Sequence, residues 1–124
     1  MKKYSWQEFD RDSQRLAKTI KKLVDGGEIN AIYGIPRGGV MLAIRLSYIL
    51  NLPLVERAEI NSTTLVVDDI AGTGRTLQEF TGHYTTTLFF CKESSVRPNF
   101  WVREAKDYIR FPWAPEDSLI RGSK

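Results

Sequence analysis

Hydrophobic and polar residues recur along this chain with two different periods, which separate the predicted helices from the predicted strands. Near the start, Ser5 and Glu8 form a helix-capping pattern. Apolar residues then follow at roughly helical spacing: Phe9, Leu16, Ile20, Leu23 and Val24. The sequence therefore predicts a long first helix that ends at the glycine pair 26–27.

Short apolar runs bounded by Gly, Pro or acidic residues predict strands. These runs cover residues 29–35, 54–60, 64–67, 85–90 and 108–111. Helices are predicted between some of them, at 41–50 and 75–82. Strands that alternate with helices favour an α/β fold with a mainly parallel twisted sheet flanked by helices, and residues 1–124 are expected to form a single domain.

Composition and charge narrow the classes of partner. The net charge of the 124 residues is +3, with acids and bases interspersed, so we expect a small anionic ligand and no nucleic acid partner. Cys91 is the one cysteine, which excludes an intramolecular disulfide and favours a cytoplasmic location. Because the chain has no apolar stretch long enough to cross a bilayer, we expect no membrane partner.

The stretch "TLVVDDIAGTGRT" carries the clearest chemistry. Asp68 and Asp69 end the β-branched run 64–67 and precede the small residues 71–74. Backbone N–H groups of such a loop, the start of the following helix and the hydroxyls of Thr73 and Thr76 all favour a phosphate. The carboxylates repel phosphate but suit sugar hydroxyls or a Mg²⁺ ion that holds a pyrophosphate. The stretch therefore indicates a phosphorylated ribose, and the alternative is a strand end with exposed acids and an ordinary turn.

Two more predicted strand ends carry unusual residues. "PRGG", residues 36–39, follows the strand predicted at 29–35, and Lys92 follows the strand predicted at 85–90. In open parallel sheets ligands bind beyond the carboxyl ends of the strands, so these residues are expected to share one edge with Asp68 and Asp69. Arg37, between a proline and two glycines, suits a second anionic group such as a pyrophosphate; the alternative is a solvated arginine in a tight turn.

At this point the chain resembles the type I phosphoribosyltransferases, whose signature is a strand ending in two acids before a Thr-Gly-x-Thr loop. "VVDDIAGTGRT" fits that signature. More narrowly, "SWQEFDRDSQRLAKTI", "PRGG" and "DYIRFPW" resemble the first helix, the pyrophosphate loop and the base-binding segment of the bacterial xanthine-guanine phosphoribosyltransferases. The resemblance runs over nearly the full length and implies a type I phosphoribosyltransferase-like fold.

The resemblance also implies a reaction: transfer of a phosphoribosyl group from phosphoribosyl pyrophosphate to a 6-oxopurine (xanthine, guanine or hypoxanthine) with release of pyrophosphate, as in purine salvage. Asp68 and Asp69 would hold the ribose hydroxyls, directly or through Mg²⁺, and Arg37 with Pro36, Gly38 and Gly39 would meet the pyrophosphate. The 5'-phosphate cradle would be formed by Ala71, Gly72, Thr73, Gly74, Arg75 and Thr76. The purine would be bound by Lys92 at its 6-oxo group, by the stacked ring of Tyr108 and by the backbone of Ile109.

Two differences from that family keep a second function open. The family carries an aspartate at the position of Gly72, and a long flexible loop where this chain has only "VERAEINST". A binding or regulatory module for a nucleotide or phosphoribosyl pyrophosphate, without turnover, is therefore the alternative to a Mg²⁺-dependent transferase. Since the relatives generally associate and the segment 41–50 is apolar, a homo-oligomer is expected.

Overall fold

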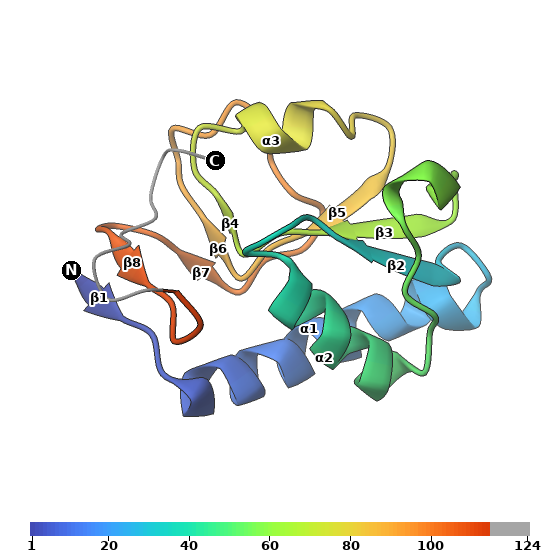
Figure 1. Cartoon of the computed structure of the whole chain (residues 1–124), viewed down its shortest axis with the longest axis horizontal. Helices are drawn as coiled ribbons and strands as arrows, with labels where there is room; N and C mark the ends of the chain where they lie inside the picture. Colours follow the sequence, from blue (N-terminus) through green and yellow to red (C-terminus); the bar gives the residue numbers. More distant parts are fainter. Residues whose placement is uncertain (115–124) are drawn as a thin grey trace.

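The computed structural model describes residues 1–114, whose helices and strands alternate along much of the chain (Figure 1). Its helical elements are α1 (Trp6–Asp25), α2 (Val40–Leu50), α3 (Arg75–Gln78) and the 3₁₀ turn η1 (Arg57–Glu59). The predicted first helix is confirmed at its start, because the Ser5 side chain accepts from the Glu8 N–H and the Glu8 side chain accepts from the Ser5 N–H. Within the described residues, no helix has both the length and the hydrophobicity that crossing a lipid bilayer requires.

Within residues 1–114 the strands form three small sheets, in which every pairing between strands is parallel. The first sheet has the order β2 (Ala31–Gly34), β3 (Thr64–Val67), β5 (Tyr84–Thr86), and the second has the order β4 (Ile70–Ala71), β6 (Phe89–Phe90), β7 (Arg103–Glu104). The third pairs β1 (Lys2–Lys3) with β8 (Ile109–Arg110). The expected α/β fold with mainly parallel strands is therefore confirmed.

Two neighbouring strands of the first sheet, β3 and β5, each lead within two residues into a strand of the second sheet. β3 continues into β4 after Asp68 and Asp69, and β5 continues into β6 after Thr87 and Leu88. Backbone hydrogen bonds join the two connecting segments: the Asp68 N–H donates to Thr86 O at 3.1 Å, and the Leu88 N–H donates to Asp69 O at 3.0 Å. The two acids thus lie at a break in the sheet rather than at a free strand end.

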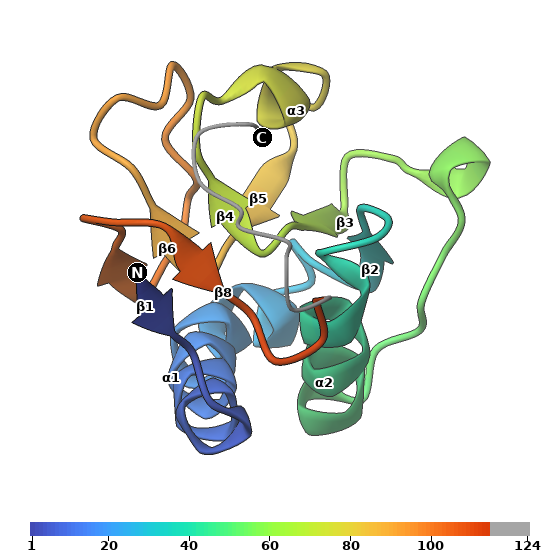
Figure 2. The same cartoon turned by 60° about the vertical axis from the view of Figure 1, so that its left-hand side comes forward.

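Helices cover both faces of the first sheet, with α1 and α2 on one side and α3 on the other (Figures 1 and 2). Because side chains alternate along a strand, Leu65 and Val67 pack in the core beneath α1 and α2, and Val66 packs with Leu77 of α3. All four side chains of β3 are fully buried. This burial fixes the register of the strand that carries the two acids.

Three predicted elements differ from the structure. The strand predicted at 54–60 is wrong: Leu54 forms one isolated bridge to Ile32, and Glu56 and Glu59 cap each other around the exposed turn η1. The helix predicted at 75–82 ends at Gln78, because the chain continues in turns such as Phe80 N–H to Leu77 O.

The strand predicted at 85–90 is divided into β5 and β6, since the Thr87 N–H turns away to donate to Phe100 O. Residues 85–90 read TTTLFF, a continuous run of β-branched and apolar residues without glycine or proline. The division is therefore imposed by tertiary pairing with the strands on either side.

Candidate functional site

Asp68 and Asp69 are held rigidly at the break in the sheet. Both residues have no exposed surface, and the Asp69 N–H donates to Asp68 Oδ1 at 2.8 Å. The Asp69 carbonyl accepts from the N–H groups of Leu88 and Phe89, at 3.0 and 3.2 Å. The neighbouring strand therefore fixes their backbone. Side chains that bind a ligand or a metal ion in one geometry need such a rigid support.

The loop that carries Arg37 packs directly against this pair. A Cβ at Gly39 would lie 2.2 Å from Val67 O and 2.8 Å from the Asp68 Cα, so only glycine allows the approach. The Gly39 N–H donates to Ile35 O at 2.9 Å, and the Ile35 N–H donates to Val67 O at the same distance. Pro36 and Arg37, joined by a cis peptide bond, are exposed at the tip, whereas Gly38 is buried.

The small-residue loop follows Asp69 and leads into α3. Ala71, Gly72 and Gly74 are buried, Thr73 and Thr76 are half-buried, and Arg75 is exposed. Thr73 Oγ1 accepts from the Arg75 N–H at 3.2 Å, and Gly74 has φ +90, which glycine adopts without strain. Since α3 has only four residues, a phosphate here would be bound by loop N–H groups and hydroxyls more than by a helix dipole.

The third loop, residues 91–97, lies alongside the small-residue loop. The Cys91 N–H donates to Ala71 O at 2.9 Å, and Ser95 donates to Thr73 O through both its N–H and its Oγ, at 2.9 and 3.0 Å. Lys92, exposed, is therefore held next to the candidate cradle. The role of Ser95 was missed by the sequence reasoning, because a serine in a polar loop carries no signal of such a contact.

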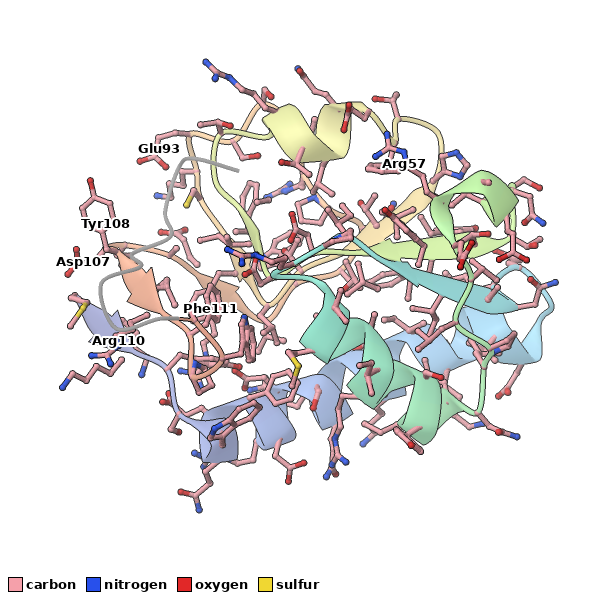
Figure 3. The ribbon with its side chains drawn as sticks, viewed as in Figure 1. Arg57, Glu93, Asp107, Tyr108, Arg110 and Phe111 are labelled. Carbon is pink, nitrogen blue, oxygen red and sulfur yellow. The ribbon has the colours of Figure 1, made fainter. Side chains whose placement is uncertain are left out.

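Tyr108 directly precedes β8, and Ile109 is the first residue of that strand. The Ala105 N–H donates to Phe90 O at 2.9 Å, so the segment that leads to Tyr108 leaves the second sheet where Lys92 follows β6. Tyr108 points outward with 49% of its surface exposed, while Phe111 turns into the interior (Figure 3). The structure thus packs the Arg37 loop against the two acids, places residues 91–97 beside the small-residue loop, and exposes the ring of Tyr108 just before β8.

The donor set fits a metal ion that is shared with a substrate. Among residues 1–114, no group of three or more His, Cys, Asp or Glu side chains could enclose an ion. The two buried carboxylates match the usual protein contribution to Mg²⁺, which takes one or two carboxylates and completes its shell with water and substrate phosphates.

Comparison with known proteins shows the fold. No family model and no curated protein matches the chain. Solved structures do match, and they show that the chain has the fold of the type I phosphoribosyltransferases.

A purine phosphoribosyltransferase from Pyrococcus horikoshii is 24% identical with a TM-score of 0.79, over 96% of this chain and 97% of that one. The xanthine-guanine-hypoxanthine phosphoribosyltransferase of Helicobacter pylori is 23% identical with a TM-score of 0.75, over 90% of both chains. A hypothetical protein from Neisseria gonorrhoeae with bound ppGpp is 18% identical with a TM-score of 0.73, over 94% of this chain and 91% of that one.

Proposed function

We propose that this protein transfers a phosphoribosyl group from phosphoribosyl pyrophosphate to a 6-oxopurine base, which is xanthine, guanine or hypoxanthine. The observation that carries the proposal is the contact of Gly39 with the end of β3, since it packs the arginine loop against two buried carboxylates that the glycine-threonine loop directly follows. Two anion-binding loops on either side of a carboxylate pair suit a sugar that carries a phosphate and a pyrophosphate. The two similar enzymes that act on purines support the same reaction.

Catalysis would rest on positioning and electrostatics. Asp68 and Asp69 would orient the ribose through its hydroxyls and hold a Mg²⁺ ion, which when bound would neutralise charge on the pyrophosphate. Arg37 would bind the pyrophosphate as it leaves, and residues 71–76 would anchor the 5'-phosphate. Lys92, the ring of Tyr108 and the backbone of Ile109 would hold the purine in line with the sugar, so that no covalent intermediate on the protein is needed.

A second candidate is a module that binds a nucleotide or phosphoribosyl pyrophosphate without turnover. It is favoured by the similar Neisseria gonorrhoeae protein with bound ppGpp and by glycine at position 72, which has no side chain to move a proton. Loss of general acid–base help lowers a rate by about 10² to 10⁴. An experiment must therefore distinguish a slow phosphoribosyl transfer from binding of the nucleotide or phosphoribosyl pyrophosphate without transfer.

The test is a turnover assay by mass spectrometry with phosphoribosyl pyrophosphate, Mg²⁺ and a mixture of xanthine, guanine, hypoxanthine, adenine, orotate and uracil. We expect a nucleoside monophosphate from a 6-oxopurine, and a loss of about 10²-fold or more in Asp69→Asn. Asp10→Asn, a change at an exposed ion pair with Arg45, is the matched control and should keep its activity. No product with intact phosphoribosyl pyrophosphate binding would favour the second candidate, and no binding would contradict both.

A further inference from the structure

The strand that carries Ile109 has little to hold it in place by itself. β8 is two residues long and its one partner strand is β1, also two residues long. A pair of such short strands is not stable in isolation. Other contacts must therefore fix this third sheet against the rest of the molecule.

Those contacts form a polar cluster at the buried end of β1. The Tyr4 hydroxyl donates to Asp12 Oδ2 at 2.5 Å, and Arg103 donates to the same carboxylate through Nε at 2.8 Å and Nη2 at 3.4 Å. Asp12 is 1% exposed and lies on the apolar face of α1 with Phe9 and Leu16. One carboxylate thus joins α1, the end of β1 and β7.

The pKa of Tyr4 and that of Arg103 are both raised, so both side chains keep their protons at neutral pH and donate to Asp12. Burial and the neighbouring Asp12 carboxylate raise the pKa of the Tyr4 hydroxyl, so it remains a donor. The Tyr4 ring packs edge-on against Phe89 at 5.1 Å and Phe111 at 5.8 Å, between the centroids. Rotation of the ring about its side-chain bonds is thus restricted on both sides.

From Tyr4 the connection reaches β8 through the backbone. The Tyr4 N–H donates to Arg110 O at 2.9 Å and the Lys2 N–H donates to Tyr108 O at 2.8 Å. In this parallel register Lys2 is opposite Ile109, so the N–H and C=O of Ile109 point to the other edge of β8. These are the backbone groups that the proposed function assigns to the purine.

We propose that the Tyr4–Asp12–Arg103 cluster is a positioning device that sets β8, and through it the ring of Tyr108 and the backbone of Ile109, for binding the base. This role rests on the proposed function. The proposed function assigns none of these three residues to the base or to the sugar phosphate, so their effect would pass through β1. The cluster therefore controls affinity for the base separately from affinity for phosphoribosyl pyrophosphate.

The test compares Tyr4→Phe, which removes only the hydroxyl, with Tyr84→Phe, which removes a tyrosine hydroxyl that donates to Glu28 at 2.7 Å from the first sheet. Amide exchange is measured first, without ligand. In Tyr4→Phe we expect the N–H groups of Lys2 and Tyr4 to exchange about tenfold faster, with Ile35 unchanged; Tyr84→Phe should change none of them. Equal exchange in Tyr4→Phe and the wild-type protein would overturn the positioning role.

Kinetics then tests the effect on the base. We expect Tyr4→Phe to raise the KM for the purine about five- to tenfold and to leave the KM for phosphoribosyl pyrophosphate within twofold. Asp12→Asn, which keeps the shape of the side chain, should behave likewise. An unchanged KM for the purine, or an equal rise in both KM values, would overturn the proposal, whereas an inactive wild-type protein would contradict the proposed function and leave the exchange result to decide the positioning role.

Discussion

The proposed ribose-phosphate end and the proposed base end of the candidate site are built in different ways. At the ribose-phosphate end, Asp68 and Asp69 have no exposed surface and lie between strands of two three-stranded sheets. At the base end, Tyr108 is half exposed next to a two-stranded sheet that a polar cluster fastens to α1. Backbone packing fixes the geometry of the first end, and a few side-chain contacts fix that of the second. Different substitutions should therefore disturb the two ends.

The largest effect is expected at the ribose-phosphate end, from Gly39→Ala. The new Cβ would meet Val67 O at 2.2 Å and the Asp68 Cα at 2.8 Å, both of them backbone atoms that cannot turn aside. We expect the free energy of unfolding to fall by about 3 kcal/mol. Urea unfolding measures it.

Gly26→Ala is the matched control for Gly39→Ala, because its backbone is helical with φ −82 and its nearest neighbour would be Lys22 O at 3.3 Å. A loss below about 1 kcal/mol is expected for the control. Equal losses in the two variants would show that the Arg37 loop is not confined by the end of β3.

A smaller effect, confined to the base end, is expected from Tyr108→Ala. A base stacked on an aromatic ring contributes about 1 to 3 kcal/mol, so the affinity for a purine nucleoside monophosphate should fall about tenfold or more. Calorimetric titration measures this affinity, and the affinity for pyrophosphate with Mg²⁺ should stay unchanged. Tyr48→Ala is the control, since Tyr48 on α2 is 81% exposed; a loss as large in this control would contradict stacking by Tyr108.

The smallest effect is a pH dependence at the base end, through Glu8. The hydrogen bond from Lys2 lowers the pKa of the Glu8 carboxyl below its ordinary value of 4.5, with the Ser5 N–H adding to it. A folded-state pKa below the unfolded one gives stability that is present above about pH 4.5 and is lost as the pH falls further. Glu8→Gln should therefore flatten the fall of the urea midpoint between about pH 5 and 3. Glu104→Gln, at an exposed residue of β7, should keep the wild-type slope, and an unchanged slope in Glu8→Gln would refute the assignment.

The same contrast explains what the sequence could predict. The strand 64–67 was predicted with its observed bounds, and α1 with its cap, because a contiguous run of residues carries each signal. The break between β5 and β6 could not be predicted, since it depends on Phe100 and Asp69 accepting bonds from distant residues. At the base end, Asp12 on the apolar face of α1 was a signal in the sequence. Its partners were not, because Tyr4 lies outside the helix and 91 positions separate Asp12 from Arg103.

The pairing of β1 with β8 has a consequence for how the protein is made. Lys2 lies opposite Ile109, so β1 is synthesised before the other described strands but must wait for β8, the last of them, before it can pair. Strands β2, β3 and β5 and the helices that cover them have all emerged by then and can fold around Leu65 and Val66. During translation the proposed ribose-phosphate end should therefore form before the proposed base end, and a chain stalled before residue 109 would contain the first without the second.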